Sequence, residues 1–163
     1  ELGHTRIAAI TGPRDMMCSL ARLDGYRSAM NSAGLTIEND WVRFGDFHVE
    51  GGRAQALALL DRPDRPTAIF AGSDLQALGA LEAARSLGLS VPDDVSIVGY
   101  DDIPLSRWVS PRLTTVHQPL RQMGVEAAKL VLSAARGEDA PGSARMDLAT
   151  SLVVRDSTAP PRA

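Results

Sequence analysis

The 163-residue sequence has little cysteine, few aromatic residues and no excess of positive charge. Its one cysteine, Cys18, excludes an internal disulfide framework. Lys and Arg number 17 against 20 Asp and Glu, so the formal net charge is -3, unlike the basic surface of a nucleic-acid-binding domain. No apolar run approaches the roughly 18 residues of a membrane helix, and no signal peptide opens the sequence. We therefore expect a soluble chain without a membrane partner.

The sequence also lacks the motifs of common catalytic and metal sites. Its three histidines, His4, His48 and His117, have no acidic partner at ligand spacing, so we expect no metal site. The stretch TGPRD at residues 11–15 lacks the glycine spacing and the lysine of a phosphate-binding loop. No G-x-S-x-G nucleophile elbow occurs. We therefore expect neither enzyme activity nor a cofactor.

Short β-branched runs alternate along the chain with amphipathic helical patterns, and 44% of the residues are hydrophobic. This alternation predicts right-handed crossovers and an α/β fold, in which helices flank a parallel sheet on both faces. The last residues, DSTAPPRA, are expected to form a frayed tail. The patterns predict strands at residues 6–11, 41–46, 67–72, 95–100, 113–118 and 150–155, and helices at residues 22–33, 51–60, 74–87 and 120–135.

Two adjacent carboxylates follow one of these strands, in the stretch SIVGYDDIPL at residues 96–105. The carboxyl ends of parallel strands share one edge, which is where ligands bind in such sheets. Because side chains alternate along an extended chain, only one of Asp101 and Asp102 is expected to face a crevice there. The other suits the turn that Pro104 opens. An alternative is that both carboxylates only cap this turn.

Arg22 and Phe47 are candidates for the same edge. Arg22 lies one helical turn after Cys18 and close to the end of the first strand. Its guanidinium suits a clamp on a polar ligand, or else an ordinary surface ion pair. Phe47 stands in a loop after a strand, where its ring can stack on a sugar or a planar base, or only plug the loop onto the core.

Ser73 and Gln118 also follow strands, but both have simpler explanations. Ser73 fits the N-cap of a helix whose first turn contains Asp74. Gln118 ends the LTTVHQ run directly before Pro119, which suits the first position of the next helix. Local capping therefore accounts for both residues without a ligand.

Together these segments resemble the ligand-binding core of the lactose and galactose repressor family, which has the periplasmic sugar-binding-protein fold. The resemblance rests on five segments in the order and spacing of the family: LGHTRIAAITGP, RLDGYRSAM, PTAIFAGSDLQALGAL, VPDDVSIVGYDDIPLSRWVSPRLTTVHQP and MGVEAAKLVL. It implies one lobe of a two-lobed domain: residues 1–119 and 148–163 form the C-terminal effector-binding lobe, and residues 120–147 belong to the other lobe. It also implies that the DNA-binding head is absent from this chain.

The resemblance implies a cytoplasmic, homodimeric transcriptional regulator or repressor. A sugar-like effector would change the arrangement of its lobes, and operator DNA would be bound only through the missing head. The effector contacts implied are Arg22, Phe47, Asp101 and Gln118, with Ser73 where many relatives carry asparagine and Cys18 in a loop that tunes ligand choice. The dimer interface implied contains Leu78, Trp108 and Val109.

Two other functions stay open. An exported sugar-binding protein of a transporter would share the fold and the site. A phosphatase or receiver-type domain would use Asp74, Asp101 and Asp102 around Mg²⁺, although no strand-end lysine accompanies them. Because the sequence enters a strand without an introductory Met, both a fragment of a longer protein and a trimmed domain are compatible with its start.

Overall fold

A computed structural model describes residues 2–137 and 146–162 of the chain. Its strands form one 6-stranded sheet in the order β2-β1-β3-β4-β5-β6. The first five strands pair in parallel, whereas β6 runs antiparallel to β5. The predicted α/β fold is confirmed, with β6 as the exception to a purely parallel sheet. The strands are β1 (Ile7–Thr11), β2 (Val42–Phe44), β3 (Ala68–Ala71), β4 (Ser96–Asp101), β5 (Thr114–His117) and β6 (Ser151–Val153).

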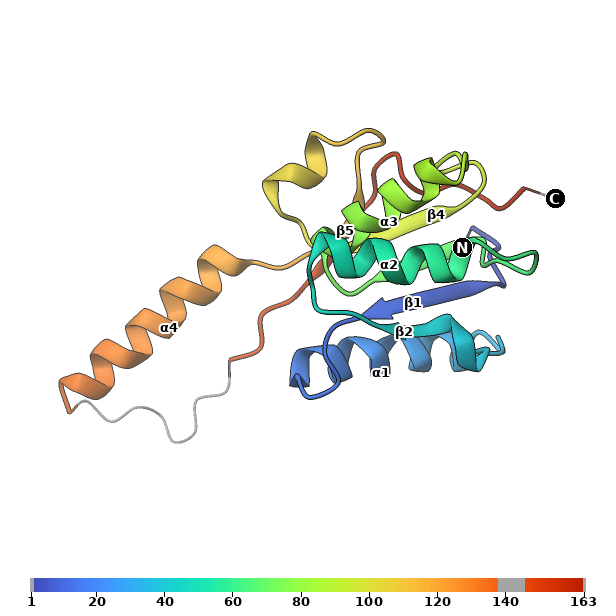
Figure 1. The fold of residues 1–163 in the computed structure, drawn as a ribbon. Helices are drawn as coiled ribbons and strands as arrows, with labels where there is room; N and C mark the ends of the chain where they lie inside the picture. Colours follow the sequence, from blue (N-terminus) through green and yellow to red (C-terminus); the bar gives the residue numbers. More distant parts are fainter. Residues whose placement is uncertain (1, 138–145, 163) are drawn as a thin grey trace.

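Helices cover the two faces of the sheet unequally (Figure 1). The helices α2 (Val49–Leu60) and α3 (Asp74–Ser86) bury one face, where Ile10, Ile69 and Ile97 form the main core with alanines of α3. On the other face, α1 (Met17–Ser32) packs its residues Leu23, Tyr26 and Met30 against Ala9. This division follows from right-handed crossovers, because β2 lies on one side of β1 whereas β3 and β4 lie on the other.

The helices α2 and α3 cross with their backbones in contact, and glycine makes this possible. A Cβ atom on Gly79 would lie 2.1 Å from the carbonyl oxygen of Val49, and one on Gly52 would lie 2.4 Å from the carbonyl oxygen of Gln76. Both distances are far below a normal contact between carbon and oxygen. The two glycines therefore allow the helix pair to lie close over the sheet.

Two features of the fold differ from the sequence predictions. The first helix begins at Met17, ahead of the predicted start at Arg22, so Cys18 lies in its first turn and not in a loop. The predicted frayed tail is wrong for Ser157, which is fully buried. The Ser157 carbonyl accepts the N–H of Ile97 at 2.8 Å, and its hydroxyl accepts the N–H of Thr114 at the same distance. The tail therefore lies beside the start of β4, just before the first pair of β4 with β5 at Val98 and Thr114.

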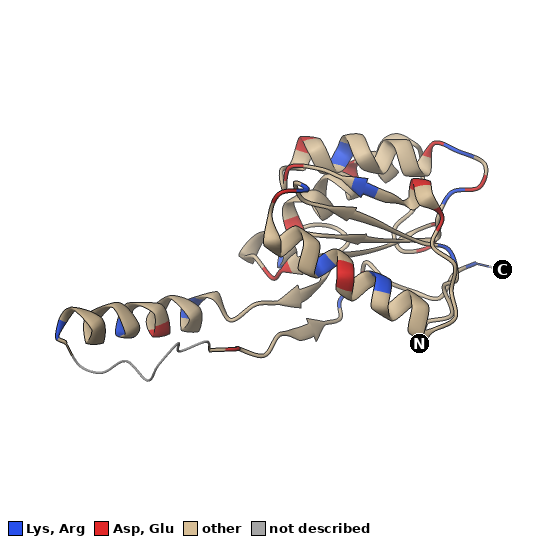
Figure 2. Cartoon of the chain, turned by 90° about the horizontal axis from the view of Figure 1, so that it is seen from below, with Lys and Arg blue, Asp and Glu red and all other residues tan. Residues whose placement is uncertain are grey.

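The fourth helix, α4 (Leu120–Ala135), stands apart from the sheet (Figures 1 and 2). It is connected through Gln118 and Pro119 to β5, and residues 146–150 lead back to β6. No residue of α4 is buried against the described part of the chain. Its exposed apolar side chains are Leu120, Met123, Val125, Val131 and Leu132.

Candidate functional site

The candidate site lies at the carboxyl ends of the central strands, where Asp101 is the last residue of β4. The Nη2 atom of Arg22, from α1, lies 3.5 Å from Asp101 Oδ1. The side-chain amide of Gln118, just after β5, donates to the same oxygen at 2.6 Å. The second guanidinium nitrogen, Nη1, donates to the carbonyl of Gly72. A carboxylate, a guanidinium and an amide from three separate segments thus meet at the carboxyl ends of the strands, where ligands bind in such sheets.

Two aromatic rings border this cluster. The Arg22 guanidinium carbon lies 4.0 Å from the ring centroid of Tyr100 and 5.6 Å from that of Phe47. The Phe47 ring also packs on Gly12, where an added Cβ would lie 2.0 Å from Phe47 Cζ. Only glycine after β1 therefore leaves room for the ring. Cations over aromatic faces are stabilised by the ring quadrupole, which helps to hold Arg22 in place.

Sequence reasoning missed Tyr100. The signal was present in the alternation of β4, because Ile97 and Gly99 face α3, which places Val98 and Tyr100 on the opposite face with α1. The arginine of α1 is therefore within reach of Tyr100.

The backbone at the two carboxylates is left-handed and not extended, as the alternation argument had assumed. Asp101 has φ 121° and Asp102 has φ 57°. Such values are uncommon outside glycine, and consecutive ones persist only where the surroundings hold them. The two carboxylates do face different partners, since Asp101 pairs with Arg22 and Gln118 whereas Asp102 pairs with Arg155 and His117, and a crevice at Asp101 stays a prediction. The cause of the different pairing is this bend and not the period of a strand.

Asp74 supports the bend from within the protein. Its side chain is fully buried, and its Oδ2 atom accepts the backbone N–H of Ile103 at 2.8 Å. The hydroxyl of Thr115 donates to Oδ1 at 2.5 Å. A Cβ on Gly99 would lie 2.3 Å from the same oxygen, so glycine in β4 makes space for the carboxylate. Asp74 is thus a buried structural acid, and both of its oxygens are used within the protein.

Burial changes the acidity of both carboxyls. It raises the pKa of Asp101 above its ordinary value, although the Arg22 charge and the Gln118 hydrogen bond act against this rise. Burial likewise raises the pKa of Asp74, against the hydrogen bonds from Thr115 and Ile103. A partly desolvated carboxylate at an open edge is a strong hydrogen-bond acceptor, which suits it to bind hydroxyl groups.

Two predicted site residues lie outside this contact network. Ser73 caps α3: its hydroxyl accepts the N–H of Gln76 at 3.2 Å and donates to the Phe47 carbonyl at 3.4 Å. Only 4% of Ser73 is exposed, so its hydroxyl is already used within the protein. Cys18 is exposed one helical turn before Arg22, and within the described residues no hydrogen bond or ion pair links it to the cluster. Effector contacts by both residues stay predictions.

The predicted dimer residues lie on another part of the surface. Leu78 of α3 and Val109 line a shallow groove of about 330 Å³ together with Leu81 and Pro111. Trp108, next to Val109, is 84% exposed. A groove with apolar residues at its base and charged Glu82 and Arg85 in its lining, beside an exposed tryptophan, is typical of a protein–protein contact.

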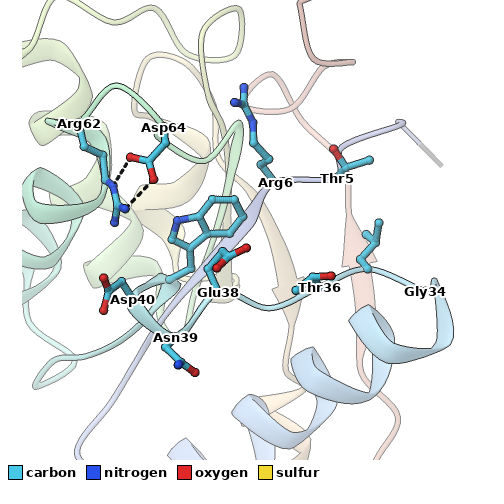
Figure 3. Close-up of a pocket in the computed structure, with 11 residues that line it drawn as sticks. Thr5, Arg6, Gly34, Thr36, Glu38, Asn39, Asp40, Arg62 and Asp64 are labelled. Carbon is cyan, nitrogen blue, oxygen red and sulfur yellow. Dashed lines mark hydrogen bonds and ion pairs between the residues drawn. The ribbon is translucent and has the colours of Figure 1, made fainter.

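A larger cavity of about 770 Å³ lies at the opposite, amino-terminal edge of the sheet. It is lined by the segment before β1, the connection from α1 to β2 and the loop before β3, and none of the predicted site residues contributes to it. In Figure 3, Arg62 and Asp64 face each other at one side, with 2.6 Å between Nε and Oδ1. Volume alone therefore does not identify the functional site.

Within residues 2–137 and 146–162, no group of three or more His, Cys, Asp and Glu side chains is arranged to hold a metal ion. In the same part of the chain, no helix combines the length and the apolar character that crossing a membrane requires.

Comparisons with known proteins agree with this geometry. Residues 1–158 match the periplasmic binding protein-like domain. The chain is 43% identical over 157 residues to the transcriptional regulator CelR of Thermobifida fusca, and 40% identical over 158 residues to the repressor CytR of Escherichia coli K12. These matches cover 96% and 97% of this chain and 46% of each relative. The chain thus spans about half the length of the curated relatives it matches.

Solved structures give the same result. The CelR–cellobiose complex superposes with a TM-score of 0.90 at 43% identity, covering 95% of this chain and 47% of that one. The Lac repressor dimer bound to operator and the anti-inducer ONPF superposes with a TM-score of 0.89 at 32% identity, covering 97% of this chain and 54% of that one. These relatives are transcriptional regulators and not enzymes. The chain belongs to the periplasmic binding protein-like domain family and, within it, to the effector-binding domains of LacI-family regulators.

Proposed function

We propose that this chain is the C-terminal part of the effector-sensing domain of a transcriptional regulator and that it binds a sugar-like molecule at Asp101. The observation that carries the proposal is the convergence of Arg22, Asp101 and Gln118 beside Phe47 and Tyr100. A carboxylate accepts hydroxyl hydrogens, the guanidinium and the amide donate to hydroxyl oxygens, and aromatic rings pack against the apolar face of a sugar. The CelR relative, solved with cellobiose, supports this ligand class.

The position of α4 supports a second lobe outside this chain. An amphipathic helix without a buried residue needs a partner surface, and both segments that carry it leave the lobe side by side at β5 and β6. We therefore assign residues 120–147 to the other lobe, of which residues 138–145 lie outside the described residues. Operator DNA would then be contacted through a separate head in the cytoplasm. A coupling of about 1–3 kcal/mol between effector and operator is typical of allosteric linkage.

Replacing Asp101 by alanine is expected to weaken sugar binding at least about tenfold, because hydrogen bonds to a charged group contribute roughly 1.5–3 kcal/mol. The measurement is calorimetry with cellobiose and D-ribose on the complete two-lobed domain, since this chain alone supplies only one side of the cleft. Asp94→Asn is the control, because Asp94 pairs with Arg162 away from the site. Equal affinities of the wild type and Asp101→Ala for the sugar that binds would refute the assignment of the site.

We also propose that Leu78, Trp108 and Val109 form a homodimer interface. In a dimer that uses this groove, a carboxylate at position 78 would lose its water, so Leu78→Asp is expected to convert the dimer to a monomer in gel filtration. The control is Met17→Asp, which places the same charge on an exposed apolar residue of α1, whereas Leu78 is half-buried. An unchanged elution volume for Leu78→Asp would count against this interface.

A further inference from the structure

Asp102 is the buried centre of an ionic cluster that the candidate site does not use, in which Arg155 is also largely buried and the side chains of His117 and Arg107 are exposed. The Asp102 side chain is 3% exposed. Oδ1 accepts from Arg155 Nη2 at 2.5 Å and from the Ser106 hydroxyl at 3.2 Å. Oδ2 lies 3.0 Å from His117 Nδ1 and accepts from Arg107 Nη2 at 3.3 Å. Every lone pair of this carboxylate is therefore directed at a partner within the protein.

Two of these partners belong to the segments that carry α4. His117 is the last residue of β5, and Arg155 follows the end of β6. Arg155 also donates through Nη1 to the carbonyl of Leu113 at 2.7 Å, so its planar guanidinium spans from Asp102 to the start of β5. The cluster thus joins the end of β4 to both the outgoing and the returning segment.

The site and the cluster use neighbouring residues on the same two segments, the end of β4 and the end of β5. Asp101 pairs with Gln118 at 2.6 Å, whereas the neighbouring residues Asp102 and His117 pair at 3.0 Å. One peptide unit separates site from cluster on each segment, and the left-handed φ angles of both aspartates restrict rotation between them. We therefore expect a shift at one pair to be accompanied by a shift at the other.

The charge of Arg155 helps to keep Asp102 ionised, so the cluster depends on this arginine. Burial acts to raise the pKa of Asp102, but the hydrogen bond and the charge of Arg155, followed by the His117 hydrogen bond, outweigh it and lower the pKa. Asp102 is thus held ionised by its partners. The Arg155 side chain is only 11% exposed, so removing it deprives a desolvated carboxylate of its best-buried charged partner, which is expected to change the position of Asp102.

We propose that Asp102 and Arg155 are positioning residues that set the place of Gln118 against Asp101 and connect this pair to the two segments that carry α4. Neither residue touches the ligand. The connection to α4 rests on the proposed function, because it gives ligand capture at Asp101 a mechanical route to the other lobe. The placement of Gln118 is independent of any ligand.

Arg155→Met tests the placement of Gln118 in the chain itself, by NMR of the Gln118 side-chain amide. Arg112→Met is the matched control: Arg112 pairs with Asp156 at 2.6 Å and joins the same two segments, but its side chain is 62% exposed. We expect the Gln118 amide protons of Arg155→Met to shift and to exchange with solvent about tenfold faster. Arg112→Met should match the wild type, and Arg155→Lys should recover part of the effect. Should the methionine variant not fold, Arg155→Lys and Asp102→Asn give the same readout.

A double-mutant cycle separates positioning from general destabilisation. On the two-lobed domain with cellobiose as the probe, Arg155→Met is expected to weaken binding about tenfold, and to cause no further loss once Gln118→Ala is present. Equal losses in both backgrounds, or Gln118 resonances of the folded Arg155→Met chain identical to the wild type, would overturn the proposal. If the wild type binds neither cellobiose nor D-ribose, the proposed sugar class is what fails, and the Gln118 resonances still decide the positioning role.

Discussion

Replacing Gly79 by alanine is expected to lower the free energy of unfolding by about 3 kcal/mol, because overpacking a tight contact costs roughly 1–3 kcal/mol and shifted backbones cost more. The new Cβ would lie 2.1 Å from the Val49 carbonyl oxygen and 2.5 Å from the Arg53 nitrogen. Both atoms belong to the backbone of α2, so no side-chain rotation relieves the clash. The helices would have to separate above the main core. Urea denaturation followed by circular dichroism measures the change.

Gly25→Ala provides the matched control for Gly79→Ala. Gly25 lies within α1, and an added Cβ there meets no atom within 4 Å. The substitution should therefore raise the free energy of unfolding by about 0.5–1 kcal/mol, through the higher helix propensity of alanine. If both variants are more stable than the wild type, the contact between α2 and α3 is looser than the structure shows.

Asp74→Ala is expected to lower the free energy of unfolding by a similar amount, about 3 kcal/mol, because it removes two hydrogen bonds to a buried carboxylate and leaves a backbone donor unpaired. The donors lost are the N–H of Ile103 and the hydroxyl of Thr115. The Ile103 bond holds the turn after Asp102, so the left-handed bend should also become mobile. Denaturation in urea at pH 7 gives the magnitude.

Asp74→Asn separates the hydrogen bonds from the charge, because asparagine keeps the shape and an acceptor oxygen. Burial raises the native pKa of Asp74 above its ordinary value of 3.8, so the native state keeps a proton that the unfolded chain has already released. The contribution of this group to stability therefore falls as pH rises from about 3.8 to the native pKa. Asparagine does not titrate, so Asp74→Asn should gain stability relative to the wild type across this window.

Parallel urea denaturation series at pH 3.5, 5 and 7 test this sign. Acids such as Asp102, whose pKa is lowered, make the opposite contribution, but they are present in both proteins and cancel in the difference. A difference in unfolding free energy that stays constant with pH would show that Asp74 is ionised as readily in the native state as in the unfolded chain.

The strands were predictable because strands form short β-branched runs, and each of the six predicted runs overlaps an observed strand. The antiparallel direction of β6 could not be predicted, because it depends on the path of the chain through α4, between β5 and β6. The early start of α1 was missed because its first turn, with exposed Met17 and Cys18, lacks the apolar spacing that marks residues 22–33. The local sequence pattern thus predicts that a helix or strand exists, whereas the direction of a strand and the exact ends of a helix depend on tertiary contacts.

The candidate site shows the same division. The strand-end rule places Asp101 at one edge with Arg22 and Phe47 without knowledge of any contact. The pairing of Asp102 with Arg155 could not be inferred, because Arg155 lies 53 residues further along the chain, beyond α4 and β6. Ser157 was likewise assigned to a loose tail, since nothing local shows that its carbonyl and hydroxyl replace a strand beside β4.

The two segments that carry α4 are themselves hydrogen-bonded neighbours, with Val116 opposite Leu152 and His117 opposite Ser151. A ribbon of two paired strands resists shear between its members but yields to torsion about its long axis. Movement of anything fixed to α4 should therefore reach the sheet as a twist of this ribbon, in which both strands turn together, and not as the sliding of one strand past the other.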